Sequence, residues 1–511
     1  MSKMVAFAIG AVVASALCAG PAAAQKSADT LRFAINDMFG GLDPLHYPHD
    51  EGGSVTRNIY ETLVAYDERK HVFVPRLAKA WRRIDDKTTE FDLREDVKFH
   101  NGDKFDAEDV KYSIDYARDP ETRIRFKERY NWVAEVQVLS PYKLRIVSKS
   151  AQSTDLQTIA YRLTIFDSKV HRKMENKSDY GRVSPITTGP YKVASYDTSK
   201  GIVLERFDDY YDKSGNYRAP VKRLVGIPIP DRQTQLAQFL TGGLDLLRDV
   251  PADTAREIQK MPNAKITVTP SGTVLYVTLD AAGRSASKAM TDLRVRKAFM
   301  MGIDRNLLAT TVIPGADPSK VLDAICYPSN IGCAPSVKPY GFNPAEAKRL
   351  LAEAGYANGL DMEFNVYAPI REIGEAIAGQ VRQVGIRASV RPLPLTLFAR
   401  MRSAGELTAF NSLYPTSAEP DVNNIFDFFF NGDRDYWKDP QIHKSMAEGL
   451  LEFDLAKRTA IYTKALDRVN ELAYIVPIAE LPTVWAHTKD VRVAENPLSA
   501  AEARVGDWFW N

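Results

Sequence analysis

Residues 91–113 read FDLREDVKFHNGDKFDAEDVKYS and place a strand, a turn and a helix one after another. From Thr89 to Lys98 apolar and polar residues alternate, with Phe91 and Val97 on apolar positions, which is typical of a half-buried strand. Asn101-Gly102 follows and suits a turn that needs a positive φ. The stretch therefore predicts a strand that turns directly into a helix.

The ends of this helix can be read from the sequence. Asp106 is a suitable N-cap, and Asp109 stands three residues later, where a capping box has its second polar side chain. An apolar stripe then runs from Val110 to Ala117, until Asp119-Pro120 ends the helix.

Elsewhere the chain alternates short strands with amphipathic helices. A helix predicted from Asn343 to Gly355 is followed by a strand at 361–367, a helix at about 371–384 and a strand that opens at Gly385. Such a β-α-β unit crosses over right-handed in nearly all proteins. The expected fold class is α/β.

Composition narrows the function classes. At about 150 residues per domain, 511 residues give a prior of roughly three domains. Lys and Arg number 67 against 65 Asp and Glu, so the basic excess of a nucleic-acid-binding protein is missing, although a local basic patch stays compatible with this balance. Beyond the N-terminus no apolar run approaches the roughly 20 residues of a membrane span, which excludes a multi-span transporter.

The N-terminus resembles an export signal. Lys3 precedes an almost wholly apolar run from Met4 to Leu17, and Ala22-Ala23-Ala24 supplies a small-residue cleavage site. We therefore expect residues 1–24 to be a signal peptide that is cleaved after Ala24, with the mature protein in the periplasm. An uncleaved anchor and a lipoprotein modified at Cys18 are the alternatives.

The cysteines agree with export. Cys326 and Cys333 remain after cleavage and lie seven residues apart in a segment rich in turn residues. In an oxidising compartment two such cysteines are expected to form a disulfide. A zinc site is the alternative, but two thiols without a nearby His or second Cys pair are too few for structural zinc.

Motifs for common chemistries are missing. The sequence contains no G-x-G-x-x-G, G-x-x-x-x-G-K-[ST], G-x-S-x-G or H-E-x-x-H pattern, so neither a cofactor nor a catalytic metal is expected.

His46 and His49 lie three residues apart, but Pro48 prevents a regular helix there. Loop histidines are therefore favoured over metal ligands. Residues 421–430, DVNNIFDFFF, are interpreted mainly as core, with an aromatic ligand pocket as the alternative.

An ordered set of short motifs resembles a known family, the family 5 extracellular solute-binding proteins, which are the peptide- and nickel-type receptors of ABC importers. The resemblance spans about residues 30–480. Its motifs are PRLAKAW from Pro75, the stretch 91–113, TGPY from Thr188, FDDYY from Phe207, GLD from Gly243, LRVRKA from Leu293 with IDR from Ile303, and residues 347–355.

The resemblance implies a type II periplasmic-binding-protein fold, with two lobes around a cleft and a hinge between them. It places the N-terminal lobe at 25–64, 185–275 and 486–511, an extra subdomain at 65–184, and the C-terminal lobe at 276–485. These three units match the prior from length.

The resemblance also implies a task. A monomeric periplasmic receptor captures a peptide-class or other small polar solute, closes around it, and delivers it to a membrane permease with its ATPase; it binds no nucleic acid and is not an enzyme. A sensor or chaperone module of the same fold is an alternative, because fold does not fix function. A secreted hydrolase would need a pair such as Glu419 and Asp421, which is weak support for catalysis.

The solute is harder to infer. Peptide-binding members hold the ligand ammonium with an Asp in a W-x-x-D stretch, three residues before an acidic-Pro pair. Here that pair is Glu419-Pro420, so Thr416 takes the place of the Asp and Leu413 that of the Trp. Glu419 or Asp421 are candidates to replace the missing carboxylate. A nickel chelate, an opine or an oligosaccharide are alternative ligands.

Further ligand-binding candidates follow from the resemblance. Asn36 and Phe39 lie in the loop after the first strand, which faces the cleft in the family. Tyr367 and Arg371 lie at the mouth of the β-α unit of the second lobe, where Arg371 would suit a ligand carboxylate. Tyr414 would stack on a ring or a peptide plane.

Overall fold

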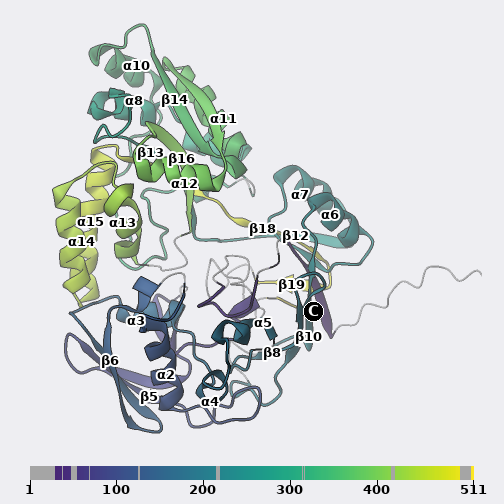
Figure 1. Cartoon of the computed structure of the whole chain (residues 1–511). Coiled ribbons are helices and arrows are strands. Elements are labelled where there is room, and N and C mark those ends of the chain that lie inside the picture. Colours follow the sequence, from purple (N-terminus) through teal and green to yellow (C-terminus); the bar gives the residue numbers. More distant parts are fainter. Residues whose placement is uncertain are drawn as a thin grey trace, which may run out of the picture.

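The computed structural model describes residues 29–36, 38, 40–47, 55–67, 70–124, 127–183, 185–213, 219–313, 315, 317–415, 421–494 and 508–510. Three main sheets organise these residues (Figure 1). We call the unit around the seven-stranded sheet the first lobe, the unit around the five-stranded sheet the second lobe, and the unit around the four-stranded sheet the subdomain.

The first lobe is built from both ends of the chain. Its strand order is β12-β18-β11-β1-β10-β9-β8. On β1, Leu31, Phe33 and Ile35 are buried and alternate with half-buried residues. The bounds are β1 Thr30–Ile35, β8 Tyr191–Asp197, β9 Gly201–Arg206, β10 Arg223–Pro228, β11 Leu246–Leu247, β12 Ala264–Thr269 and β18 Thr483–Thr488, with helices α4 Ser168–His171, α5 Tyr180–Val183, α6 Arg232–Leu240 and α7 Ala252–Gln259. A short pair, β19 (Val491–Val493) and β20 (Trp508–Trp510), follows β18.

The second lobe is a sheet between two layers of helices, in the order β15-β14-β16-β13-β17. One apolar cluster packs α8 to α11 on one face, and another packs α12 to α15 on the other. The bounds are β13 Thr273–Leu279, β14 Leu360–Tyr367, β15 Ile386–Leu393, β16 Ala409–Pro415, β17 Ile475–Glu480, α8 Leu293–Met301, α9 Arg305–Thr311, α10 Pro344–Glu353, α11 Arg371–Arg382, α12 Leu395–Ala404, α13 Val422–Phe430, α14 Pro440–Leu451 and α15 Leu455–Glu471.

The subdomain contains the stretch that predicted a strand, a turn and a helix. Its sheet, β4-β5-β7-β6, packs against α2. As predicted, Asp106 and Asp109 form a capping box at the start of α2, and Gly102 has a φ of 93°. The strand is shorter than predicted, because β5 ends at Leu93. The bounds are β2 Val64–Asp67, β3 Val72–Pro75, β4 Ala78–Arg83, β5 Thr88–Leu93, β6 Val133–Ser140, β7 Lys143–Ser148, α2 Ala107–Arg118 and α3 Asp155–Arg162.

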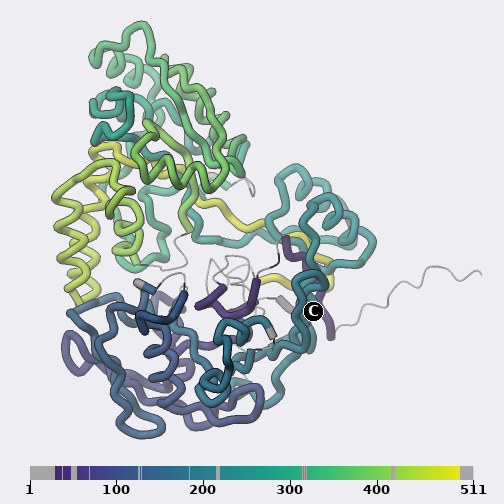
Figure 2. The backbone as a smooth tube through the Cα atoms, in the orientation of Figure 1, coloured from purple at the N-terminus to yellow at the C-terminus, as the bar shows by residue number. Residues whose placement is uncertain are grey.

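Two segments join the lobes. The chain leaves the first lobe after β12, at residues 270–272, and returns before β18, at residues 481–482. Figure 2 shows the two passages running next to each other, and the strands beside them pair at Thr269 with Thr483 and at Val274 with Glu480. The predicted lobe borders at 275/276 and 485/486 fall within β13 and β18. Within the described residues, no helix is both long enough and apolar enough to cross a bilayer.

Candidate ligand site

The carboxyl edge of the second-lobe sheet faces the crossing segments. β14 is parallel to β15 and β16, so Tyr367, Leu393 and Pro415 end their strands at one edge. Pro415 also pairs with Thr273, the first residue of β13 after the crossing. The chain therefore enters the second lobe at the edge where these strands end.

The first lobe presents the equivalent edge. β1 and β10 are parallel and end together at Ile35 and Pro228. β12 runs in the same direction, because β12 and β11 both pair antiparallel with β18 and β11 is parallel to β1. The crossing thus joins the carboxyl edges of both sheets, and ligands of open α/β sheets bind beyond such edges.

Asn36 lies at this edge of the first lobe. It follows β1, and its Oδ1 accepts a hydrogen bond of 2.6 Å from Gln235 Nε2 on α6. The same nitrogen donates to the carbonyl of Ile229, also at 2.6 Å. Asn36 is therefore held in position by an element of the same edge. Phe39, predicted beside it, lies outside the described residues.

Tyr367 and Arg371 differ in their surroundings. Tyr367 ends β14 half-buried, with its ring centroid 6.1 Å from that of Phe398. Arg371 begins α11, its side chain is 61% exposed, and its Nε donates to Glu375 Oε1 at 2.7 Å. A ligand carboxylate at Arg371 would have to compete with this neighbour on the same helix.

Tyr414 and Asp421 flank the segment of Thr416 and Glu419, two residues that lie outside the described ones. The Tyr414 hydroxyl donates to the carbonyl of Asn424 on α13, at 3.4 Å, and its ring lies 4.4 Å from that of Phe428. Tyr414 therefore connects the end of β16 to α13.

Asp421 is fully buried. Its Oδ1 accepts from Asn423 N at 2.8 Å and caps α13, and its Oδ2 lies 3.1 Å from Arg458 Nη2. Burial raises the pKa of the Asp421 carboxyl, and the charge of Arg458 opposes the rise. The carboxylate is thus engaged within the protein.

Two arginines that no sequence pattern marked lie beside the predicted tyrosines. The guanidinium carbons of Arg402 and Arg434 each lie 5.1 Å from the ring centroid of Phe428. Arg402 also lies 5.9 Å from the ring of Phe398, so it stands between the rings that contact Tyr367 and Tyr414. Within the described part of the chain neither guanidinium pairs with a carboxylate.

These arginines share a buried neighbour. Burial keeps the pKa of Tyr276 above its usual range, although the positive charges of Arg402 and Arg434 act in the opposite sense. The positive charges of Arg402 and Arg434 thus both lie near the ring of Phe428 and the hydroxyl of Tyr276. No local pattern signalled this group, because Arg402 and Arg434 are far apart in the sequence and Phe428 was interpreted as core.

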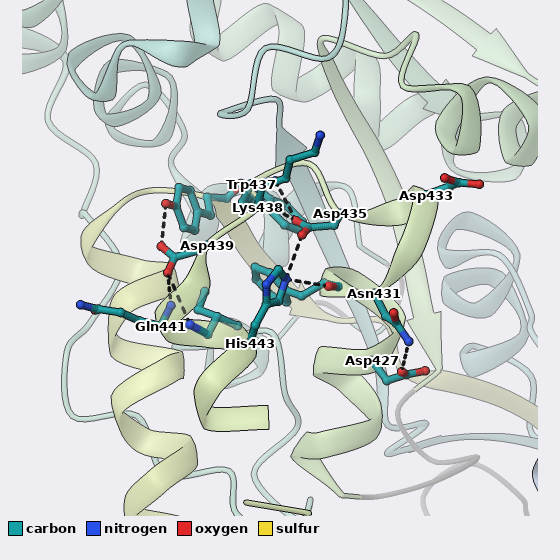
Figure 3. Close-up of polar contacts among 12 residues, drawn as sticks. Asp427, Asn431, Asp433, Asp435, Trp437, Lys438, Asp439, Gln441 and His443 are labelled. Carbon is teal, nitrogen blue, oxygen red and sulfur yellow. Dashed lines mark hydrogen bonds and ion pairs between the residues drawn. The ribbon is translucent and has the colours of Figure 1, made fainter. Parts of the chain in front are cut away.

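The rest of the aromatic run is core, as predicted. Phe426, Phe429 and Phe430 are buried between α13 and its neighbours. The polar contacts that follow the run, shown in Figure 3, order the connection from α13 to α14: Asp435 accepts from the backbone of Trp437 and Lys438 and contacts His443.

This polar group lies away from the crossing. Trp437 Nε1 donates to the carbonyl of Leu279 at 3.0 Å, and Leu279 ends β13 at the opposite side of the sheet from Thr273. We therefore assign Asp435, Trp437 and His443 to the fold and not to the ligand site. The Arg434 side chain in the same connection differs, because it contacts the ring of Phe428, which in turn contacts Tyr414.

Two further predictions concern cysteine and histidine. Cys326 and Cys333 form the predicted disulfide, with a Cα–Cα distance of 5.9 Å. His46 lies in a turn, where its Nδ1 contacts Asp43 and its Nε2 contacts the Tyr116 hydroxyl at 2.9 Å. His49 lies outside the described residues, among which no three His, Cys, Asp or Glu side chains form a group suited to a metal ion.

Comparison with known proteins supports this fold. The model of the bacterial extracellular solute-binding proteins, family 5 Middle, matches residues 72–437. Glutathione-binding protein GsiB of Escherichia coli (strain K12) is 24% identical over 501 residues, which cover 94% of each chain.

Two solved structures have similar folds. NikA from Brucella suis in complex with Fe(III)-EDTA has a TM-score of 0.83 at 24% identity, over 94% of this chain and 100% of that one. DppA from Helicobacter pylori in complex with the peptide STSA has a TM-score of 0.74 at 19% identity, over 94% and 98%. The two-lobe α/β architecture is therefore shared with these proteins.

Proposed function

Because the chain belongs to family 5 of the bacterial extracellular solute-binding proteins, we propose that it is the periplasmic receptor of an ABC importer. It captures a small polar or peptide-class solute and delivers it to a permease in the inner membrane. Export with cleavage after Ala24 and a monomeric state are part of this proposal. The task requires binding and release but no catalysed reaction.

One observation carries the proposal. The two lobes turn the carboxyl edges of their sheets toward the crossing, and among the described strands the connections there are residues 270–272 and 481–482. Closure about two such strands brings the edges together around a ligand. The ligand stabilises the closed form to the extent that it binds that form more tightly than the open one.

We further propose that the solute carries an anionic group that binds at Arg402 and Arg434. Two guanidiniums near one ring repel each other, and an anion between them would relieve that repulsion. Guanidinium groups bind carboxylates with charge-assisted, often bidentate hydrogen bonds. Tyr414 and Tyr367 would then contact the apolar part of the same ligand.

The residues of the proposed site favour a solute with an anionic group. Thr416 stands where peptide-binding members have the Asp for the ligand ammonium, so a cationic end loses its usual partner. Two similar proteins bind ligands that carry carboxylates, namely glutathione and Fe(III)-EDTA. A zwitterion or a chelate with free carboxylates therefore fits better than a purely cationic solute.

A binding experiment tests both parts of the proposal. Mature protein purified from the periplasm is examined by native mass spectrometry for a co-purified solute. It is then screened by thermal shift with glutathione, glutathione diethyl ester, Met-Leu and Fe(III)-EDTA. We expect at least one anionic compound to raise Tm at saturation, and its esterified form to have little effect.

The two parts fail in different ways. If neither a co-purified solute nor any of the four compounds binds, the receptor function is wrong. If an ester binds as tightly as its parent acid, the receptor function stands and the anion site at Arg402 and Arg434 is wrong.

A further inference from the structure

The subdomain touches the second lobe at a small polar contact. Ser153, two residues before α3, donates from its backbone N to the carbonyl of Leu450 at 2.9 Å. Its Oγ donates to the carbonyl of Gly449 at 3.1 Å. Figure 1 shows the ends of α14 and α15 beside the subdomain at α3. This contact therefore joins parts of the chain that the hinge would separate.

Arg458 strengthens the contact and connects it to α13. Its Nη1 donates to the carbonyl of Ser153 at 3.0 Å, and its Nη2 lies 3.1 Å from Asp421 Oδ2. The side chains of Arg458 and Asp421 are 8% and 0% exposed. One planar guanidinium thus holds the subdomain with one nitrogen and the N-cap of α13 with another.

Two side-chain contacts surround this bridge. The guanidinium of Arg83, held by Asp155 at 2.5 Å, lies 4.4 Å from the ring centroid of Phe453 in the α14–α15 turn. Ile331, within the loop closed by the disulfide, packs into the apolar cluster of the subdomain. The backbone of Ile331 accepts from Val422 N at 3.0 Å, so this loop also meets the start of α13.

A continuous series of contacts links the bridge to the proposed ligand site. The Tyr414 hydroxyl bonds to Asn424 in the first turn of α13, Asp421 caps that turn, and Arg458 carries the connection to Ser153. A ligand that fixes Tyr414 would therefore also fix the first turn of α13 and its cap, Asp421. Asp421 in that position holds Arg458 where it bonds to Ser153 of the subdomain.

We propose that Ser153, Gly449, Leu450 and Arg458 form a latch that holds the subdomain to the second lobe when the lobes close, and that Arg458 couples this latch to the ligand site. The latch rests on the proposed function, because it requires lobes that open and close. It is made of three hydrogen bonds and a few side-chain contacts, and so it is weak enough to open. The structure shows it engaged.

A cysteine trap tests whether the latch opens. Ser153 N donates to the carbonyl of Leu450 at 2.9 Å, so the two backbones lie close together and a cysteine pair can be tried at these positions. The Ser153→Cys, Leu450→Cys chain is oxidised, checked by mass for the new bond, and compared by small-angle X-ray scattering without added solute with the Ser153→Cys single variant, in which Cys326–Cys333 also stays oxidised. We expect a smaller radius of gyration in the oxidised double variant. Equal radii, or failure of the bond to form, would overturn the latch.

The coupling through Arg458 needs a second measurement. Arg458→Lys keeps a positive charge beside Asp421 but loses the planar group that bridges Asp421 and Ser153. Arg468→Lys is the control, because it makes the same change on α15 at an arginine that pairs with Asp439. In hydrogen exchange we expect Arg458→Lys to speed the amides of both 153–160 and 422–430 by about tenfold, the value of one charged hydrogen bond.

The control variant should leave both segments unchanged. If Arg458→Lys affects 422–430 but not 153–160, Arg458 serves only the fold of the second lobe and the coupling is wrong. These measurements need no solute, so they are independent of whether any of the four screened compounds binds.

Discussion

His100 is a buried histidine whose two ring nitrogens are both engaged. Its Nε2 bonds to the carbonyl of Gly189 at 2.9 Å, and its Nδ1 meets the Thr187 hydroxyl at 3.2 Å. Burial lowers the pKa of the imidazole to about 4, from 6.5 in the unfolded chain. If Nδ1 were protonated, it could no longer accept a hydrogen bond from the Thr187 hydroxyl.

We therefore expect His100 to weaken the fold in acid. Because its folded pKa is lowered, its contribution to stability is complete above pH 6.5 and is lost as pH falls toward 4. His100→Gln should remove about 1–3 kcal/mol of the pH dependence between those values. Urea unfolding of both proteins at several pH values measures this, and a constant difference between them would contradict it.

Asp109 acts in the opposite sense and serves as the control. Burial raises the pKa of its carboxyl to about 6, so the folded state binds a proton that the unfolded state releases. Its contribution is complete below about pH 4 and is lost as pH rises toward 6. Asp109→Asn should therefore change the slope of the stability profile with the sign opposite to that of His100→Gln.

Arg402 and Arg434 give a residue-level test of the anion site. Replacing either by Gln should weaken the affinity for an anionic solute by about 10–100-fold, the value of a lost charge-assisted bond. Both guanidiniums lie against the Phe428 ring and repel each other, so the Tm of either variant without solute should equal or exceed that of the parent. Isothermal titration with the co-purified solute measures the affinity.

The control for this pair lies on α12, two residues before Arg402. Arg400 pairs with Glu406 at 3.1 Å, and Arg400→Gln should leave the affinity unchanged. If the Arg402→Gln, Arg434→Gln double variant binds the solute as the parent does, the arginines do not form the site.

At the scale of elements, α14 depends on a glycine. A Cβ on Gly449 would lie 2.1 Å from Cε1 of Tyr462, and one on Gly332 would lie 2.6 Å from Cδ2 of the same ring. The Tyr462 ring is fully buried, and both glycine backbones lie against it. Gly449→Ala should therefore destabilise the protein by about 1–3 kcal/mol through overpacking.

Gly379 on α11 is the matched control. Nothing lies within 4 Å of a Cβ there, so Gly379→Ala should gain about 0.5–1 kcal/mol from helix propensity. Urea unfolding compares the two variants. Equal stabilities would show that the Tyr462 ring yields to the added methyl group.

Elements were predictable where their signals are local. The start of α2 followed from Asp106 and Asp109, and α10 (Pro344–Glu353) lies within the helix predicted from Asn343 to Gly355. The strand predicted at 89–98 ends at Leu93. Val97 and Phe99 are buried as the alternation indicated, but they lie in the loop that follows the strand. Alternation shows which residues are inside but not which backbone pairs.

The ligand site was less predictable, because its parts meet only in the folded chain. Tyr367 was predicted to end a strand and ends β14, whereas Tyr414 was expected in a turn-prone stretch and lies within β16, one residue before its end. Whether either tyrosine contacts a solute stays a prediction. Arg402 and Arg434 carry no local mark and meet because α12 packs against the short turn Gly432–Arg434 that follows α13. The engagement of Asp421 by Arg458 likewise depends on a helix that follows much later in the chain.

At the scale of the whole molecule, two short crossings should make closure a motion of the lobes. We expect the radius of gyration to fall when the co-purified solute is added back to protein from which it was removed by unfolding and refolding. Small-angle X-ray scattering at matched concentrations measures this. Superimposable curves with and without a saturating solute would contradict a hinge at residues 270–272 and 481–482.

The place of β18 bears on how the chain is made. β18 separates β11 from β12 and pairs with both, yet it is among the last strands to leave the ribosome. The second lobe has all its strands once Glu480 has emerged, whereas β12, whose partner among the described strands is β18, stays unpaired until Thr483–Thr488 arrives. A nascent chain halted before Thr483 therefore carries a finished half joined to an open sheet, the form in which chaperones and proteases would meet it.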